Sequence, residues 1–577
     1  MAIGSLLVSR GIKTTAAAQS FFNPTLDDLQ DPMLMLGMKE AVARIQQALA
    51  ASEAILIYGD YDVDGTTATV LLKTAIERIA PKDRPAKVTY HVPHRIREGY
   101  GMQTNVLGDA AVAGVRLVIS VDTGIRAFAA ADEAIALGLD LIVTDHHLPD
   151  DVAGVPEALA VINPAQEGCP YPFKYLCGAA VAFKLAHALL LAASSTDVER
   201  ARLKTVIVPS FLKLVAIATI ADSVPLVGEN RVIASLGLRE LSNPVQPGLR
   251  ALMQVAQIPL DRAPTATEVG FRLAPRINAA GRMDIASDVV ELFHTRDVEK
   301  AQTLAEKLDT LNNDRRATEA TALEAIEAQL ATMKNAAGDY PAEVIVLDDP
   351  AWHRGVIGIL ASRVIDRTAR PALVLTHEGG KAHGSGRSIE GFHLLDALTA
   401  VHGGHSSEPL FTRFGGHAHA VGFSLPSDQV DRLRDRMQAY SAAYLTAPML
   451  TPRLDCDLEV SVDDITDSFY EWLERCGPFG NAHPEPIFVL RNVVLNAAPR
   501  IIKDKHICLE LERPGATPIS ALGWTRNIDW RLRCTALSLE QGSKIDLAAK
   551  IRRNANPQFG GVELEICDLQ LPLRQIA

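Results

Sequence analysis

The sequence predicts an α/β fold in which two α/β lobes are joined by a long helix and followed by a C-terminal OB-like β-barrel. Three observations lead to this prediction. From residue 54 to about residue 224, short apolar runs alternate with helix-like runs, as in a parallel sheet with helical crossovers. The same alternation starts again at Glu343, after an uninterrupted helical pattern over 297–335. The last part of the chain contains short strand-like runs separated by Gly, Pro and Asn.

The first three parts of the chain lead up to the long helix. Residues 1–50 are a helical lead-in with an amphipathic helix over 38–49. Residues 51–230 form the first lobe, with strands over 55–58, 87–92, 117–121, 141–144 and 158–162 and helices over 66–79, 127–137 and 178–192. Residues 231–337 are helical and end in the connector helix, which is longer than an ordinary globular helix.

The last two parts are the second lobe and the barrel. Residues 338–448 predict strands over 343–347 and 372–376, helices over 355–365 and 426–445, and a Gly- and His-rich stretch between them. Residues 449–577 predict about five strands, over 487–495, 506–511, 520–524, 545–551 and 561–569. Five short strands favour a barrel of the OB type, and a β-sandwich is the alternative.

Composition and charge narrow the class of protein. At 577 residues, with 48% apolar and 5% aromatic residues, the chain is an ordinary α/β protein of several domains. We see no apolar run of the ~20 residues that a bilayer requires and no export signal at the N-terminus. Seven scattered Cys without a C-x-x-C pair indicate reduced thiols. These features predict a cytoplasmic protein without a membrane partner.

The charge is unevenly distributed along the chain. Residues 491–577 contain 13 Lys and Arg against 9 Asp and Glu, although the whole chain has a net charge of −12. Net charge bears on solubility and does not exclude a locally basic groove. The basic bias of the predicted barrel is compatible with nucleic-acid binding.

Three predicted strands of the first lobe end in loops rich in metal-liganding side chains. These loops contain Asp60, Asp62 and Asp64, then Asp122, and then Asp145, His146 and His147. The carboxyl ends of parallel strands meet at one edge of a sheet, where ligands bind. In an extended loop the three alternating aspartates would also share one face. So many carboxylates repel one another unless cations bind, and a divalent metal site is therefore expected.

The kind of metal site follows from the donor types. The first loop resembles a calcium-binding loop only superficially, because no Glu follows at the twelfth position. Oxygen donors with one imidazole suit Mg²⁺ or Mn²⁺, and two such ions would activate water and stabilise the leaving oxygen of a phosphodiester. For any single Asp the alternative is an N-cap on the following helix. Asp222, at the end of an apolar helix, is either a ligand or a loop residue.

At this point a family resemblance becomes specific. The segments 59–65, 121–124, 144–147 and 221–226 resemble the four motifs of the DHH phosphoesterase superfamily in order and spacing. Further segments resemble the RecJ family of single-strand-specific exonucleases and lie at 275–283, 352–362, 384–391, 414–422 and 478–488. The resemblance covers nearly the whole chain. It implies a metal-dependent 5′→3′ exonuclease that degrades single-stranded DNA to 5′-mononucleotides in repair and recombination.

The resemblance also implies roles for particular residues. Two Mn²⁺ or Mg²⁺ ions would be held by Asp60, Asp62, Asp64, Asp122, His146 and Asp222. His147 would contact the scissile phosphate, and Asp145 would orient a neighbouring His. Gly415, Gly416 and His417 resemble the signature of the DHHA1 substrate-binding domain. Further candidates for substrate binding are Arg276, Asn278, Arg282, Ser385 and Arg387, and an ordinary ion pair is the alternative for each Arg.

The expected substrate and partners complete this interpretation. A cleft between the lobes would admit one strand, and the barrel would hold the trailing strand by charge and base stacking, with His506, Trp524, Trp530 and Phe559 as candidate platforms. A single-strand-binding protein and a RecQ-type helicase are partners that the resemblance implies. The rival functions are a DHH phosphodiesterase for short oligonucleotides or cyclic dinucleotides, a pyrophosphatase, and a non-catalytic replication scaffold. The appended barrel disfavours the two small-substrate enzymes, and the complete set of acidic positions disfavours the scaffold.

Overall fold

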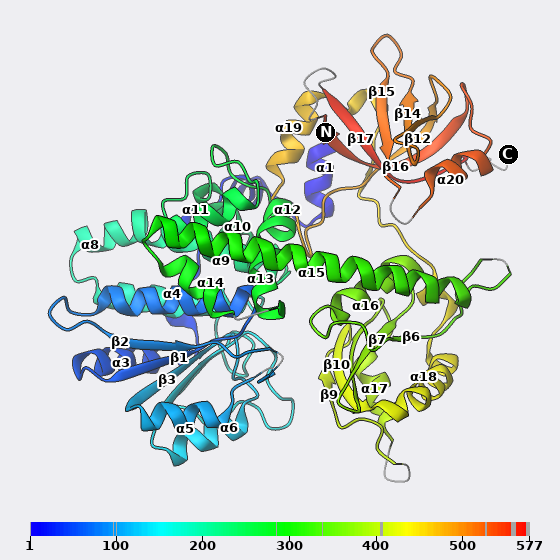
Figure 1. Cartoon of the computed structure of the whole chain (residues 1–577). Coiled ribbons are helices and arrows are strands. Elements are labelled where there is room, and N and C mark those ends of the chain that lie inside the picture. The colour runs from blue at the N-terminus through cyan, green and yellow to red at the C-terminus, as the bar shows by residue number, and fades with distance from the viewer. Residues whose placement is uncertain are drawn as a thin grey trace. The chain divides into compact units, whose positions relative to one another are not determined.

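A computed structural model describes residues 2–95, 97–99, 101–283, 286–336, 338–403, 408–525, 528–554 and 561–572. The chain forms two compact units (Figure 1). The first comprises Met1–Asn312 together with Asp467–Pro486, and the second comprises Asn313–Thr466 together with Ile487–Ala577.

The first unit is built on a five-stranded parallel sheet in the order β2-β1-β3-β4-β5. The strands are β1 Ala54–Tyr58, β2 Lys87–His91, β3 Val115–Val121, β4 Asp140–Thr144 and β5 Ala160–Ile162. The predicted parallel sheet is confirmed. The strand order reverses between β1 and β3, and this switch point is where doubly wound sheets bind ligands at their carboxyl edge.

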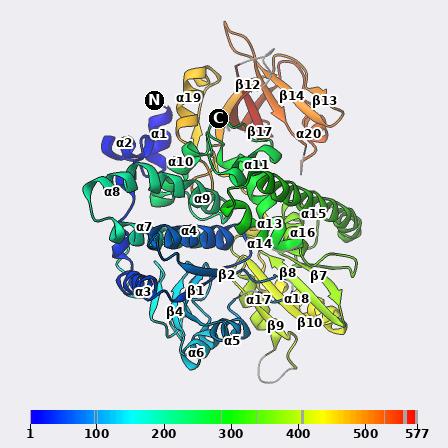
Figure 2. The ribbon, with the colours of Figure 1, turned by 60° about the vertical axis from the view of Figure 1, so that its left-hand side comes forward.

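Helices cover both faces of this sheet, as Figures 1 and 2 show. One face packs against α3 Met38–Ala50, α4 Val63–Ile79 and α7 Gly178–Ala193, and the other against α5 Thr104–Val112 and α6 Phe128–Ala136. β1 alternates accordingly: Ile55 and Ile57 are in the first core cluster, and Leu56 and Tyr58 are in the second. Because both faces of the sheet are buried, each strand appears in the sequence as a continuous apolar run.

The lead-in and the helical region complete the first unit. The lead-in contains α1 Ala2–Ser9 and α2 Thr15–Phe22, and α3 is the predicted amphipathic helix. The helical region contains α8 Asp197–Arg202, α9 Val208–Ala221, α10 Gly228–Glu240, α11 Pro247–Val255, α12 Ala266–Glu268, α13 Ala274–Met283 and α14 Ser287–His294. The long helix α15 Val298–Met333 has 36 residues, and it begins in the first unit and ends in the second. α19 Asp467–Arg475 belongs to the first unit, although it comes after the second lobe in the sequence.

One helical run is long and apolar enough to cross a bilayer, although charged residues interrupt it and it is not an uninterrupted apolar run. The run Asp197–Ala221, which includes α8 and α9, has 25 residues and meets that criterion by length and composition. However, 61% of its apolar window is buried inside the protein, and α9 packs against α4, α7 and α10. We interpret it as a core helix of the first unit.

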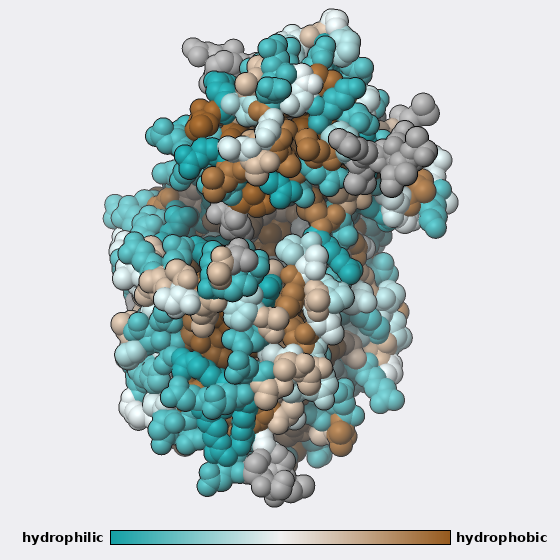
Figure 3. Space-filling model, turned by 90° about the vertical axis from the view of Figure 1, so that its right-hand side faces the viewer, coloured by the Kyte–Doolittle hydropathy of each residue, from teal (hydrophilic) through white to brown (hydrophobic). Residues whose placement is uncertain are grey.

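The face of the protein drawn in Figure 3 is mainly hydrophilic, with groups of apolar residues between the polar ones.

The α/β part of the second unit has a mixed sheet in the order β6-β7-β8-β10-β9. Its strands are β6 Ile345–Asp348, β7 Ala372–Glu378, β8 Lys381–Arg387, β9 Arg413–Gly416 and β10 Ala420–Pro426, and its helices are α16 Ile357–Thr368, α17 Leu394–His402 and α18 Val430–Tyr444. β6 and β7 pair in parallel, and the other pairs are antiparallel. The Gly- and His-rich stretch thus contains three strands and a helix that the sequence pattern did not reveal.

The C-terminal part of the second unit is a barrel-like sheet in the order β11-β12-β16-β17-β15-β14-β13. Its main strands are β12 Phe488–Val494, β14 His506–Leu511, β15 Ile519–Gly523, β16 Lys544–Arg553 and β17 Val562–Gln570. A bridge between Leu495 and Leu511 joins the end of β12 to β14 and closes the sheet. This closure favours the predicted OB-like barrel over a sandwich. The short strands β11 Leu458–Glu459 and β13 Arg500–Ile502 and the helix α20 Trp530–Ala536 were not predicted.

Candidate metal centre

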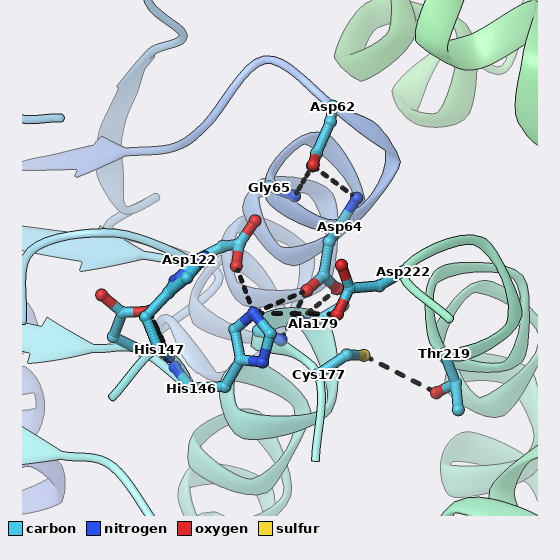
Figure 4. Close-up of polar contacts among 12 residues, drawn as sticks. Asp62, Asp64, Gly65, Asp122, His146, His147, Cys177, Ala179, Thr219 and Asp222 are labelled. Atoms are coloured by element: carbon cyan, nitrogen blue, oxygen red, sulfur yellow. Dashed lines mark hydrogen bonds and ion pairs between the residues drawn. The ribbon is translucent and has the colours of Figure 1, made fainter. Parts of the chain in front are cut away.

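Acidic and imidazole side chains converge at the carboxyl edge of the parallel sheet, next to the switch point (Figure 4). Asp60 follows β1, Asp122 follows β3, and the Asp145–His147 segment follows β4. The sequence predicted this convergence from the places where the apolar runs end. Asp60, Asp122 and Asp145 are buried, with relative exposures of 4%, 2% and 1%.

The first acidic loop is not the extended segment that the alternating aspartates suggested. α4 begins at Val63, and Asp62 is its N-cap, with Oδ1 accepting hydrogen bonds from Asp64 N at 2.9 Å and Gly65 N at 3.0 Å. Asp64 lies in the first turn of the helix. The start of a helix, and not an extended loop, therefore brings the aspartates together. The hydrogen bonds of the Asp62 cap stabilise the helical conformation over the extended one. The N-cap alternative is correct for Asp62, and it does not prevent Asp62 from facing Asp60 and Asp122.

Asp64 is held by the N-terminus of α7. Gly178 N donates to Asp64 Oδ2 at 2.6 Å, and Ala179 N donates to Asp64 Oδ1 at 2.8 Å. The first amides of a helix have no partner within the helix, and its dipole favours a negative charge at this end. The sequence predicted a helix of small residues over 178–192, but this role was missed. The Gly178–Ala180 run of small residues before an apolar stretch was the available signal.

His146 lies among three carboxylates that come from different elements. Its Nε2 is 3.3 Å from Asp122 Oδ1, 3.7 Å from Asp64 Oδ2 and 3.8 Å from Asp222 Oδ2 (Figure 4). Asp222 follows directly after α9, so that the end of this apolar helix places a carboxylate in the cluster. Burial lowers the pKa of His146, which favours the neutral imidazole with a free lone pair.

Asp145 and His147 form a hydrogen-bonded pair within the cluster, and a ring nitrogen of His147 lies within 4.8 Å of ligand atoms of Asp122 and His146. His147 Nδ1–H donates to Asp145 Oδ1 at 2.7 Å, and Asp145 also accepts from the backbone amides of Ile125, His146 and His147. Burial lowers the pKa of His147, but the hydrogen bond to Asp145 and its charge outweigh burial and raise that pKa to about 9. The raised pKa favours the protonated form of His147. The neighbouring His that the Asp145 side chain orients is His147.

The clustered carboxylates are strained by one another's charge. Burial, followed by repulsion from neighbouring aspartates, raises the pKa of Asp60, Asp122 and Asp222 well above 3.8. Asp122 also has a φ of 60°, in the left-handed region that non-glycine residues seldom adopt. Backbone strain of this kind concentrates at functional sites, and a cation bound in the cluster would offset the repulsion between its carboxylates.

The donor atoms fit two divalent cations. Asp60, Asp62 and Asp122 form one group of ligand atoms within 4.8 Å of one another, and the group of Asp64, His146 and Asp222 is similarly compact. A third group of the same size, Asp122, His146 and His147, overlaps both of them. Among the described residues, Asp60 Oδ1 and Asp122 Oδ1 are buried and accept no hydrogen bond. Buried carboxylate oxygens normally have partners, so these two are suited to a cation.

Arg95 is a neighbour of the cluster that the sequence analysis missed. Its guanidinium lies 4.9 Å above the Tyr61 ring, and its charge acts to lower the pKa of Asp60. Arg95 stands in a basic segment, with His94 and Arg97, directly after β2. That position at the carboxyl edge of the sheet was the signal that could have identified it.

The predicted substrate-binding residues of the first unit lie on α13. Arg276 Nε donates to Asp309 Oδ1 at 2.8 Å and Arg276 Nη1 donates to Arg272 O at 2.6 Å, so the ion-pair alternative describes Arg276 better than a contact with DNA. Asn278 Oδ1 accepts from Val63 N at 3.1 Å, at the start of α4. Arg282 is near enough for its charge to act on Tyr61.

The predicted residues of the second unit lie on or directly after β8 and β9, the two strands that flank β10. Ser385 of β8 is paired with Gly422 of β10, which is paired with Gly415 of β9. Gly416 has a φ of 141°, and a Cβ there would lie 2.2 Å from Ala420 O, so this turn requires glycine. The remaining members of the set are Arg387 at the end of β8 and His417 directly after β9.

The predicted stacking platforms of the barrel have different environments. The rings of His506 and Trp524 meet edge to face, with centroids 5.0 Å apart. Trp530 is buried and donates its Nε1–H to Trp524 O, so it is a core residue. Phe559 lies outside the described residues.

Comparisons with known proteins agree with this geometry. A family model described as "DHH family, N-terminal domain" matches residues 54–219, one described as "DHHA1 domain" matches 342–443, and one described as "RecJ OB domain" matches 456–568. The chain is 38% identical over 499 residues to the single-stranded-DNA-specific exonuclease RecJ of Dickeya dadantii, and the alignment covers 86% of this chain and 84% of the relative. The corresponding Bacillus subtilis protein is 37% identical over 91% of this chain, which spans 63% of that relative's length.

Solved structures show the same likeness. The structure of RecJ from Thermus thermophilus in complex with Mn²⁺ superimposes with a TM-score of 0.79 at 28% identity, covering 99% of this chain and 76% of that chain. The same protein in complex with Mg²⁺ gives a TM-score of 0.73 at 27% identity, covering 99% and 74%. These matches confirm the predicted arrangement of two α/β lobes, a long helix and an OB-like barrel within one chain.

Proposed function

Since the chain belongs to the RecJ family of single-stranded-DNA-specific exonucleases, we propose that it removes 5′-mononucleotides from single-stranded DNA in the 5′→3′ direction. The reaction depends on two Mn²⁺ or Mg²⁺ ions. The observation that carries this proposal is the convergence of five aspartates and one histidine at the switch point of the parallel sheet.

The six residues divide between two cation sites. Asp60, Asp62 and Asp122 provide one set of ligands, and Asp64, His146 and Asp222 provide the other. Asp122 lies between the sets, because its Oδ1 is also 3.3 Å from His146 Nε2. A bound pair of cations supplies an activated water and stabilises the negative charge on the leaving oxygen.

His147 binds the scissile phosphate as a cation. Its Nδ1 is engaged with Asp145, and the protonated ring supplies a charged donor for a phosphate oxygen. Asp145 fixes the orientation of the ring and, by its charge, keeps the imidazole protonated. We therefore assign metal binding to His146 and phosphate binding to His147.

The second unit holds the rest of the strand. Ser385 of β8 lies on one side of β10 and Gly415 and Gly416 of β9 on the other, with Arg387 at the end of β8 and His417 directly after β9. Glycines allow backbone amides to approach a phosphate, and an arginine adds a forked charged donor. The barrel, with its basic bias, binds the trailing strand through charge and base stacking. Arg282 of α13 contacts the DNA backbone near the 5′ end.

The wider role is DNA repair and recombination in the cytoplasm. Single-stranded DNA is the partner that the site itself requires. A single-strand-binding protein and a RecQ-type helicase, which would supply single strands, are the proposed protein partners.

The test is digestion of 5′- and 3′-labelled oligonucleotides, single-stranded and duplex, with Mn²⁺, Mg²⁺ or a chelator. Early loss of the 5′ label from single strands only, with a metal and not with the chelator, supports the proposal. Preference for a dinucleotide or for pyrophosphate would favour a small-substrate phosphoesterase. No cleavage under any metal, with no Mn²⁺ bound, would favour a non-catalytic scaffold.

A further inference from the structure

The start of α4 carries two of the proposed metal ligands, so its backbone must be fixed. The first amides of a helix need acceptors from outside its regular hydrogen bonding. Asp62 Oδ1 accepts from Asp64 N and Gly65 N. The amide of Val63, the first helical residue, has a different acceptor: it donates to Asn278 Oδ1 at 3.1 Å.

Asn278 reaches this amide from a helix that is distant in sequence. It stands on α13, 215 residues further along the chain. One turn later on the same helix is Gly281, where a Cβ would lie 2.4 Å from Tyr61 O. The absence of a side chain at Gly281 lets α13 approach the acidic loop closely enough for Asn278 to reach Val63. Two residues of one helix face thus contact the backbone on both sides of Asp62.

We propose that Asn278 is a positioning residue for the metal centre and does not serve as a ligand for DNA. By accepting the Val63 amide, it fixes the point at which α4 begins, and with it the directions of the Asp62 and Asp64 carboxylates. This inference rests on the proposed two-metal function. It departs from the sequence-based prediction, which grouped Asn278 with the substrate-binding residues.

The physical consequence of losing the acceptor is local. Val63 is buried, so that its amide would be left without a partner and without access to water. The helix start would fray or shift to recover a partner. The Asp62 cap would then no longer hold its carboxylate against Asp60 and Asp122. Substitution of a residue that orients a metal ligand without touching the metal typically weakens metal binding by roughly 10- to 100-fold.

The experiment compares Asn278→Leu, which keeps the size and removes the acceptor, with Asn278→Asp, which keeps the acceptor oxygen. Gln254→Leu, an exposed amide on α11, is the matched control. Three quantities are measured in the full-length protein: amide hydrogen exchange of the 60–66 segment without metal, the Mn²⁺ dissociation constant by calorimetry, and kcat and KM on a single-stranded oligonucleotide.

In Asn278→Leu we expect faster exchange in the 60–66 segment, Mn²⁺ binding weakened by about tenfold or more, and a lower kcat that rises with added Mn²⁺. Asn278→Asp should retain the exchange protection, and Gln254→Leu should match the wild type in all three. A raised KM for DNA in Asn278→Leu, with unchanged exchange and Mn²⁺ affinity, would overturn the proposal and restore a DNA-contacting role.

Two further safeguards separate the possible failures. If the thermal melt shows that Asn278→Leu does not fold, Asn278→Ala replaces it. If neither variant folds, Asn278→Asp decides: retained exchange protection in the folded variant would support the inference, and loss of that protection would overturn it. A wild-type protein that binds Mn²⁺ but does not cleave DNA would contradict the proposed function. The exchange and Mn²⁺ measurements would still decide the role of Asn278 in that case.

Discussion

A β-carbon added to Gly178 would lie 2.3 Å from Asp122 Oδ1, closer than any real contact. Gly178 is also the first residue of α7, and its amide donates to Asp64 at 2.6 Å. One glycine therefore brings a helix N-terminus against two acidic side chains of the proposed metal centre. The positive end of the α7 dipole partly compensates their charge.

Gly178→Ala should weaken Mn²⁺ binding by roughly 10- to 100-fold and reduce nuclease activity in parallel. The new methyl group must displace either the Asp122 carboxylate or the helix that holds Asp64. Calorimetric Mn²⁺ titration and oligonucleotide digestion over a range of Mn²⁺ concentrations measure the effect. Gly108→Ala in α5 is the matched control, because a Cβ there meets no atom within 4 Å. Wild-type Mn²⁺ affinity in Gly178→Ala would contradict the assigned contact.

Asp122→Ala should abolish cleavage, whereas Asp145→Ala should reduce it less at saturating Mn²⁺. Asp122 is a ligand of one cation site and its Oδ1 lies 3.3 Å from His146 of the other, whereas Asp145 acts through the His147 ring. Without Asp145 the imidazole also loses the partner that raises its pKa to about 9, so the activity of Asp145→Ala should fall at a lower pH than that of the wild type. The measurement is kcat/KM as a function of pH. Equal losses in both variants would show that Asp145 belongs to the metal ligands.

The metal-free protein should lose stability as the pH rises above 3.8. The pKa values of Asp60, Asp122 and Asp222 are raised in the folded state, so the folded protein holds protons that the unfolded chain releases near 3.8. Stability from this source is complete below that pH and is lost as the pH rises through the folded-state values. Thermal melts with chelator and with Mn²⁺, from pH 4 upward, should therefore diverge increasingly, and Asp122→Asn should reduce the divergence. If the melting temperature changed with pH in the same way with chelator and with Mn²⁺, the result would contradict the raised pKa values of these aspartates.

Arg276→Ala should destabilise the first unit without changing the affinity for DNA. The guanidinium is largely buried, with 12% of the side chain exposed, and is paired with Asp309. Loss of hydrogen bonds to a charged group corresponds to about 1–3 kcal/mol in the free energy of unfolding. Chemical denaturation of Arg276→Ala, Asp309→Asn and the double variant measures the coupling between the two residues. A raised KM with unchanged stability would instead favour the DNA contact predicted from the sequence.

The sequence predicted the parts of the site that depend on local pattern. The runs before Asp60, Asp122 and Asp145 are apolar on both faces, and a parallel sheet brings their ends to one edge. The local pattern gave a wrong prediction where two conformational preferences compete. The alternating aspartates fit an extended loop, yet capping by Asp62 and the helix-forming residues after it start α4 at Val63.

The remaining features depend on contacts that are distant in sequence. Nothing near Asn278 indicates that its partner is the amide of Val63, and nothing near Gly178 indicates the Asp122 carboxylate beside it. β8 and β9 were missed because glycine, histidine and arginine replace the β-branched residues that mark a strand. The placement of α19 in the first unit is likewise a matter of tertiary packing.

The most direct test of the two-cation site is a crystal structure with Mn²⁺, in which anomalous scattering locates the metal ions. Two peaks are expected, one among Asp60, Asp62 and Asp122 and the other among Asp64, His146 and Asp222. Ligand distances close to those typical of oxygen and nitrogen donors should accompany both peaks. No peak among these side chains, or a single peak at saturating Mn²⁺, would contradict the two-metal centre.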